Sequence, residues 1–220
     1  MGDSSGISVT DETLQRSEAA HRTPPGKRPA GTEIRSTYGV TIRQGISLKY
    51  RNEEHKMAIK KVVEHPAKVL STPCAEVKEI NEEIITLLDD LYDTMVEYDG
   101  VGIAAPQINV GLRVAIVELG EERDILEMIN PTVIETDGAE VDIEGCLSFP
   151  GLYGEVERPD YVKIEACDRE GRVYELEAGG FDARAILHEI DHLDGVLFDS
   201  KIKRILTEEE LEAMYAEEEE

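Results

Sequence analysis

The sequence predicts an α+β domain with antiparallel sheet, and three observations carry this prediction. Short apolar segments typical of strands occupy the middle of the chain, between about residues 112 and 178. A strongly amphipathic helical pattern precedes them. Two further helical patterns follow them, so the helices are segregated at the two ends of the strand region, as in α+β folds.

The helix before the strands is predicted from about Asn81 to Tyr98, and Asp99-Gly100 closes it. Its apolar residues recur at helical spacing and form one broad stripe, which we assign to the core. The stripe comprises Ile84, Ile85, Leu87, Leu88, Leu91, Tyr92, Met95 and Val96.

The strand region contains a clear hairpin. Residues 161–167 and 172–178 alternate between apolar and polar, and Asp168–Gly171 joins them with a glycine at the left-handed position of the turn. The other strands are predicted at 112–119, at 126–129 continuing through 132–135, and at 140–143, while residues 59–63 form a short strand or a turn.

The two helices after the strands have recognisable ends. The first is predicted from about Phe181 to Leu193, with apolar residues at helical spacing and Gly195 as its C-terminal stop. Thr207–Glu210 matches a capping box and starts a short last helix, which ends in four glutamates.

Composition and charge restrict the classes of function. The 220 residues carry a net charge of −25, which argues against nucleic-acid binding through a basic face. Three cysteines do not make a disulfide framework and fit a reducing, cytoplasmic compartment, and Cys74 and Cys167 read as small buried hydrophobes. No apolar run approaches the length of about 18 residues that a membrane span requires.

Residues 1–56 differ from the remainder of the chain. They are rich in Ser, Thr, Gly, Pro, Arg and Glu, with scattered apolar residues and a breaker cluster at residues 23–29. We expect this segment to be mostly disordered, because it cannot bury enough apolar area to offset its ordering entropy. Residues 57–220 then form the functional domain, with 14 Lys/Arg, 41 Asp/Glu and a net charge of −27.

The helix predicted from residue 181 carries the pattern H-E-x-x-H. His188 and His192 are four residues apart and lie on one face, so both imidazoles can face a single metal ion. Glu189 lies beside that face and can reach a metal-bound water as general base. So short a pattern also arises by chance, and by itself it only suggests a metal site.

A catalytic tetrahedral site needs a third protein ligand, and the chain offers two sources. Zincin-type proteases take it from a downstream glutamate or a further histidine. No histidine follows His192, and the downstream glutamates, from Glu208 on, lie in an exposed-looking helix. Cys146 is the better candidate, because it follows Gly145 directly after a predicted strand and can present a thiolate from a tight loop.

Three segments together resemble the signature segments of the peptide deformylase family, in the same order along the chain. They are Gly100–Gln107, Glu144–Ser148 and His188–His192, and the likeness covers about Met57 to Lys203. The resemblance implies removal of the formyl group from the N-terminal formyl-methionine of new polypeptides. It also implies a fold in which antiparallel sheets surround the metal-ligand helix.

The resemblance assigns the metal ligands and the general base. Cys146, His188 and His192 would bind one divalent ion, natively Fe(II) with Zn, Ni or Co as substitutes, and the ligand chemistry suits all four. The metal-bound water would attack the formyl carbon. Glu189 would take its proton and pass it to the leaving amine.

The resemblance also assigns oxyanion donors and substrate contacts. The side-chain amide of Gln107 and the backbone N–H of Leu147 would donate to the developing oxyanion. Val101, Gly102 and Gly145 would contact the substrate, an extended N-formyl-methionyl peptide paired by its backbone.

Two interactions near the site remain open at this stage. Glu144 and Arg158 form either a buried pair that braces the loop of Cys146 or an ordinary surface pair, and the buried pair requires a low pKa for Glu144. Asp191 is expected to orient a metal ligand or to cap nearby backbone groups.

The sequence departs from the family pattern in three places. Leu187 replaces the usual glutamine before the first histidine, and we expect altered tuning. Arg184 stands at a position that is apolar in many members and close to the methionine pocket, which its stem could line. The C-terminal residues 217–220 are all glutamate and would be repelled by RNA phosphates, which argues against docking to the ribosome through this tail.

Two alternatives to a deformylase are carried forward. One is a zincin-like endopeptidase, and the other is a catalytically silent homologue that only binds formylated peptides or metal. The intact set of predicted catalytic residues disfavours the second.

Overall fold

The computed structural model describes residues 41–43, 58–120 and 124–217. The predicted disorder of residues 1–56 therefore lies outside the described residues, with one exception. Thr41–Arg43 forms a short strand, which the sequence did not indicate.

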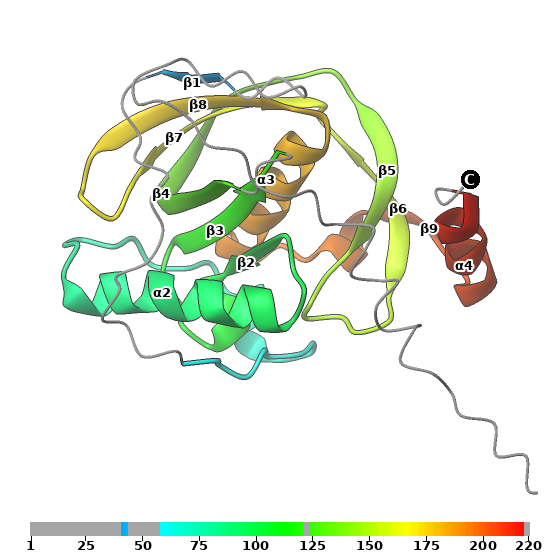
Figure 1. Ribbon diagram of the computed structural model, residues 1–220, viewed down its shortest axis with the longest axis horizontal. Helices are drawn as coiled ribbons and strands as arrows, with labels where there is room; N and C mark the ends of the chain where they lie inside the picture. Colours follow the sequence, from blue (N-terminus) through cyan, green and yellow to red (C-terminus); the bar gives the residue numbers. More distant parts are fainter. Residues whose placement is uncertain (1–40, 44–57, 121–123, 218–220) are drawn as a thin grey trace, which may run out of the picture. The chain divides into compact units, whose positions relative to one another are not determined.

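The described chain contains strands, α-helices and 3₁₀ helices (Figure 1). The strands are β1 (Thr41–Arg43), β2 (Gly102–Ala104), β3 (Val114–Leu119), β4 (Asp124–Asp137), β5 (Glu140–Gly145), β6 (Tyr153–Arg158), β7 (Tyr161–Cys167), β8 (Val173–Gly179) and β9 (Ile202–Ile205). The helices are α2 (Glu82–Glu97), α3 (Gly180–Leu193) and α4 (Glu208–Glu217), with 3₁₀ turns η1 (Lys68–Ser71), η2 (Ala105–Ile108) and η3 (Phe198–Lys201).

The strands form two antiparallel sheets. One has six strands in the order β1-β8-β7-β4-β3-β2, and the other has three in the order β5-β6-β9. Helix α3 lies between the larger sheet and the β5–β6 hairpin (Figure 1). The antiparallel α+β fold predicted from the sequence is confirmed. No described helix is both long and apolar enough to cross a membrane.

Helix α2 begins and ends where the local sequence provides caps. The side chain of Asn81 accepts hydrogen bonds from the backbone N–H groups of Glu83 (3.0 Å) and Ile84 (3.2 Å) in the first turn, where N–H groups have no partner from the standard helical pattern. Asp99 has a φ of 53°, and the N–H of Gly100 donates to the carbonyl of Met95, so the helix closes with a left-handed residue.

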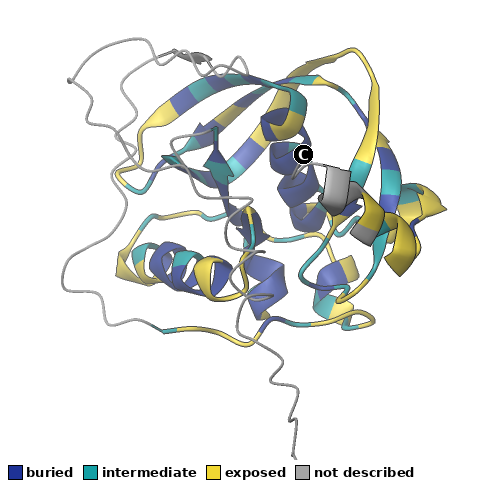
Figure 2. Ribbon diagram, turned by 45° about the vertical axis from the view of Figure 1, so that its right-hand side comes forward, coloured by how far each residue is buried: buried dark blue, intermediate teal, exposed yellow. Residues whose placement is uncertain are grey.

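Strand β3 is buried on both faces, which explains its nearly continuous apolar run. Val114 and Ile116 pack in one core cluster with the apolar face of α2. Ala115 and Val117 pack in a second cluster with β4, β7, β8 and α3. Figure 2 shows the result, with α2 buried along one side and α3 buried over most of its surface.

The structure differs from the sequence prediction mainly at short or polar strands. The predicted continuation of one strand across Asn130-Pro131 is confirmed, since both apolar segments belong to β4, whose pairing with β7 shifts register there. Residues 59–63 contain no strand. The sequence did not predict β2, β6 or β9, because β2 has only three residues and β6 and β9 carry charged residues at half of their positions.

Asn130 ties the loop before α2 to the sheet. Its side chain accepts from the N–H of Val77 and donates to the carbonyl of Val77, both at 2.8 Å, and its own φ is 52°. Asn tolerates this left-handed conformation better than most residues.

We predict that Asn130→Ala lowers the free energy of unfolding by about 2–4 kcal/mol, from two lost hydrogen bonds and left-handed strain. Asn130→Gly loses the same hydrogen bonds without the strain, so it should cost less. Urea unfolding of the three proteins measures both values. Equal stability of Asn130→Ala and the parent would contradict this account.

Candidate metal centre

Helix α3 fixes the two histidines. His188 and His192 lie one turn apart with ring centroids 5.1 Å apart. The helix ends at Gly195, which has a left-handed φ of 72°. The N–H of the next residue, Val196, donates to the carbonyl of Asp191 and closes the last turn. A Cβ on Gly195 would lie 2.9 Å from the backbone nitrogen of Pro73, so the stop predicted from the sequence is also a packing requirement.

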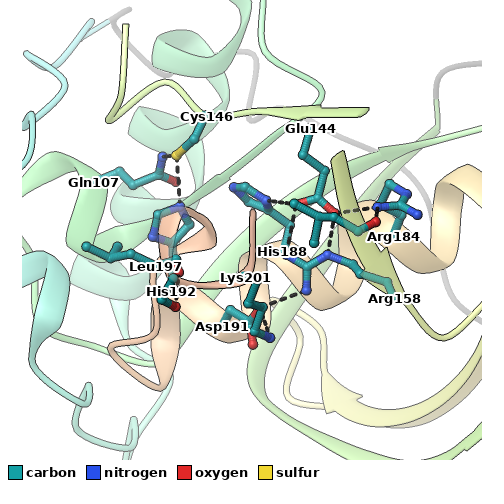
Figure 3. Close-up of polar contacts among 12 residues, drawn as sticks. Gln107, Glu144, Cys146, Arg158, Arg184, His188, Asp191, His192, Leu197 and Lys201 are labelled. Atoms are coloured by element: carbon teal, nitrogen blue, oxygen red, sulfur yellow. Dashed lines mark hydrogen bonds and ion pairs between the residues drawn. The ribbon is translucent and has the colours of Figure 1, made fainter. Parts of the chain in front are cut away.

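Cys146 comes from the end of β5. A Cβ on Gly145 would lie 2.6 Å from the ring of Tyr153 on the paired strand, so glycine is needed for this hairpin to close. The next residues turn, with the N–H of Phe149 donating to the carbonyl of Cys146 at 2.9 Å. The thiol is thereby presented at the tip of the hairpin, facing α3 (Figure 3).

The three predicted ligands converge. Cys146 Sγ lies 3.2 Å from His192 Nε2, and the ligand atoms of Cys146, His188 and His192 all lie within 4.8 Å of one another. One thiol and two imidazoles suit a divalent transition metal, and their mutual distances match a common ion at ordinary bond lengths. Within the described part of the chain, no glutamate of α4 joins this group.

Glu144 holds the ring of His188. Its Oε2 lies 2.9 Å from His188 Nδ1, which leaves Nε2 of that ring for a metal. Arg158 donates to both oxygens of Glu144, and both side chains are at most 5% exposed. The predicted pair is therefore the buried one. The pKa of Glu144 is lowered despite burial, because His188 and Arg158 donate to its carboxylate.

Asp191 does not take the role we predicted for its side chain. Its Oδ2 accepts from Arg158 Nη1 at 2.7 Å and from Lys201 Nζ at 2.5 Å, and not from a ring nitrogen. Two cations next to it are stronger partners for a carboxylate than a neutral imidazole. The carboxylate that orients a metal ligand is that of Glu144 (Figure 3).

The guanidinium of Arg184 has partners that the sequence did not indicate. Its guanidinium turns toward Glu144, and its side chain is only 4% exposed, so the charged end does not face an apolar substrate pocket. The buried carboxylate attracts it more strongly than a pocket wall would. Leu187, the other departure, is partly buried and packs against the core cluster on the α3 side of the larger sheet.

Glu189 is buried beside the ligands and 4% exposed. Burial raises its pKa to about 7, and its Oε2 has no hydrogen-bond partner in the described structure. Gly102 on β2 makes room for it, since a Cβ there would lie 2.6 Å from Glu189 Oε1. Gly102 thus has a packing role toward Glu189 that sequence reasoning missed, because nothing in the local pattern links the two residues.

Gln107 lies in η2 with its amide aimed at the site. Its Oε1 accepts from the N–H of Ala104 at 2.8 Å, which turns Nε2 toward Cys146 Sγ (3.7 Å) and Ser148 Oγ (3.4 Å). The backbone of Gln107 is also held by the segment before η1, because the N–H of Val63 donates to the carbonyl of Gln107 at 2.7 Å. Leu147 follows Cys146 and packs against the α2 cluster.

The residues predicted to contact the substrate lie at the start of β2 and at the end of β5. Val101 is 37% exposed just before β2, and β2 is the last strand of the six-stranded order. Gly145 is exposed at the end of β5. A thiol and two imidazoles that meet beside a buried carboxylate in an antiparallel α+β fold are the arrangement expected of a metal-dependent hydrolase. The chain belongs to the polypeptide deformylase family, whose sequence profile matches residues 59–208. Its function is the metal-dependent removal of the formyl group from N-formylmethionine peptides.

Relatives and solved structures agree with this assignment. Peptide deformylase 1 of Bacillus subtilis (strain 168) is 55% identical over 158 residues, which cover 72% of this chain and 99% of the relative. A class I type b peptide deformylase from Acinetobacter baumannii with Met-Ala-Ser bound is 33% identical, with a TM-score of 0.63, and the match covers 67% of this chain and all of that one. The Thermotoga maritima enzyme is 33% identical with a TM-score of 0.64, covering 66% and 99%.

Metal binding should release a proton from His188. Burial lowers the pKa of His188, but hydrogen bonds with Cys146 and Glu144 outweigh burial and raise it to about 10. The metal-free ring is therefore protonated at neutral pH, while a metal binds the neutral ring. Because this pKa lies above the unfolded value of 6.5, the proton stabilises the metal-free fold fully below about pH 6.5, and this contribution is lost as the pH rises through about 10.

We predict that metal affinity rises with pH between about 6 and 9, and that protons are released on binding at pH 7. Calorimetry in buffers of different ionisation enthalpy measures the number released. A binding enthalpy independent of the buffer would contradict the prediction.

Proposed function

We propose that Cys146, His188 and His192 bind the catalytic metal and that Glu189 is the general acid and base of deformylation. The observation that carries this proposal is the convergence of the three ligand atoms within 4.8 Å, beside a buried carboxylate that has one oxygen without a partner. A bound divalent ion would lower the pKa of a water and polarise the formyl oxygen. We propose Fe(II) as the native ion, with Zn, Ni or Co as substitutes, since the donor set suits each of them.

Glu189 is suited to move the proton. Its pKa of about 7 lies close to neutrality, so the carboxylate can accept a proton from the attacking water and later donate it. The water adds to the formyl carbon, the C–N bond breaks, formate leaves and the amine takes the proton. Burial of the carboxylate keeps bulk water from competing for that proton.

Gln107 and Leu147 would stabilise the oxyanion. The amide of Gln107 is turned so that Nε2 faces Cys146, and Ala104 fixes that orientation through Oε1. A donor placed before the reaction costs no reorganisation when charge develops. The backbone N–H of Leu147, next to the ligand Cys146, would be the second donor.

The outer edge of β2 would receive the peptide. An N-formyl-methionyl chain added there would pair through its backbone, which tolerates variable side chains beyond the first residue. Val101 and Gly102 would line one side and Gly145 the other. A side chain on Gly102 would push against the carboxylate of Glu189, and its absence would let the formyl end approach Glu189 closely.

The remaining assignments concern the context of the enzyme. We propose that residues 57–220 make up the catalytic domain and that it acts in the cytoplasm on new polypeptides. The first turn of α4 consists of three glutamates, so contact with ribosomal RNA through this helix is disfavoured.

We predict that Glu189→Gln binds metal with the parent's stoichiometry but loses turnover by about 10²–10⁴-fold, because the amide cannot accept the proton. Formate release from formyl-Met-Ala-Ser measures turnover, and metal analysis of the same samples measures binding. The acetyl analogue is the substrate control and should release no acid from the parent. Cleavage of internal peptide bonds, or full activity of Glu189→Gln, would contradict the proposal.

Gly102→Ala should reduce turnover by about 10²-fold or more, because the new Cβ displaces the carboxylate of Glu189 from its working position. Gly111→Ala is the matched control, since a Cβ on Gly111 has no atom within 4 Å. Formate release and thermal unfolding of both variants separate catalysis from stability. Equal activity of the two variants would show that Gly102 does not position Glu189.

A further inference from the structure

Arg184 connects the two elements that supply the metal ligands. It lies on α3, one turn before His188 and on the same face of the helix. Its Nη1 donates to Glu144 Oε1 (2.7 Å) and to the carbonyl of Val156 (2.9 Å), and its Nη2 donates to the carbonyl of Glu140 (3.0 Å). All three acceptors belong to the β5–β6 hairpin, whose tip carries Cys146.

The link is well placed to control the geometry of the centre. His188 and His192 come from α3, whereas Cys146 comes from the hairpin, so their separation depends on how these elements are held together. A planar guanidinium that reaches one carboxylate and two carbonyls fixes direction as well as distance. A side chain that filled the same space without donors would leave two buried acceptors, on Glu144 and Val156, and the part-buried carbonyl of Glu140 with fewer partners.

Arg184 also constrains the carboxylate that orients His188. Glu144 accepts from Arg184 and from Arg158 Nε through Oε1, and this leaves Oε2 for His188 Nδ1 and Arg158 Nη2. Figure 3 shows Glu144 between the two arginines and the ring. When Arg184 is removed, Arg158 remains as a counter-ion on both oxygens of Glu144, so the carboxylate stays compensated but loses one of the two donors that fix Oε1.

We propose that Arg184 is a positioning residue for the metal centre, which sets the register of α3 against the β5–β6 hairpin and fixes Glu144 toward His188. The inference rests on the proposed ligand set. It predicts that loss of Arg184 weakens metal binding and changes ligand geometry in a protein that still folds. Groups of this kind, which orient ligands without touching the metal, typically change metal affinity by about 10–100-fold.

The test compares Arg184→Met and Arg184→Lys with Arg169→Met. Arg169 is the matched control, because it too is a largely buried arginine that bridges elements, donating to Glu127 on β4 and Asp89 on α2 away from the centre. Chelator competition measures metal affinity, the visible absorption of the Co(II) protein reports ligand geometry, and thermal unfolding reports stability.

We expect Arg184→Met to lose affinity about tenfold or more with an altered Co(II) spectrum, and Arg184→Lys to be intermediate, because an ammonium cannot match three acceptors at once. Arg169→Met should unfold at lower temperature and keep the parent's affinity and spectrum. Parent-like affinity and spectrum in Arg184→Met would overturn the proposal, as would an equal loss of affinity in Arg169→Met. If Arg184→Met does not fold, Arg184→Lys decides, and parent-like affinity there would overturn it.

His188→Ala in the same assays tests the ligand set separately. Retention of the metal by His188→Ala would contradict the proposed ligands and, with them, the role of Arg184. Loss of the metal in His188→Ala, together with parent-like behaviour of Arg184→Met, would contradict the role of Arg184 alone.

Discussion

The carboxylate of Glu144 is the interaction on which the metal centre depends. It stands at the end of β5, two residues before Cys146, and it contacts the ring of His188 on α3. Arg158 and Arg184 hold this carboxylate directly, and Asp191 in turn holds Arg158. His192 has no comparable support, since its Nδ1 is buried without a hydrogen-bond partner among the described residues. Its ring is therefore fixed by packing, and the oriented ligand is His188.

Charges behind the centre alternate in sign from the interior to the surface. Arg184, Glu144, Arg158, Asp191 and Lys201 follow one another through ion pairs at 2.7 Å or less. An isolated buried charge would be costly, but each member here has an opposite neighbour and the last, Lys201, reaches solvent. Breaking an inner pair should therefore affect the centre more than removing Lys201.

The sequence predicted which residues come together at the site better than it predicted the strands of the surrounding sheets. The two histidines and Glu189 share one helical turn, so local spacing was sufficient. Cys146 required a comparison of distant segments, which the glycine and serine around it made possible. The partners of Arg184 lie 28 to 44 residues away on a hairpin whose second strand, β6, had no readable pattern. The sequence shows that Arg184 lies four residues before His188. This spacing places the two side chains on the same face of the helix, but it does not indicate which residues Arg184 contacts.

The contact between Gly102 and Glu189 shows why such limits arise. Glycine before an apolar residue in a short strand is compatible with a turn, a bulge or a close approach, and the sequence does not distinguish them. Only the sheet order, with β2 at its end and beside α3, brings the missing Cβ against a carboxylate. In the proposed mechanism the same absence of a side chain would serve two needs, because it leaves room for the carboxylate of Glu189 and keeps the edge of β2 free for the formyl end of the peptide. A larger residue at position 102 would interfere with both at once, so in this proposal the position links the shape of the substrate site to the placement of Glu189.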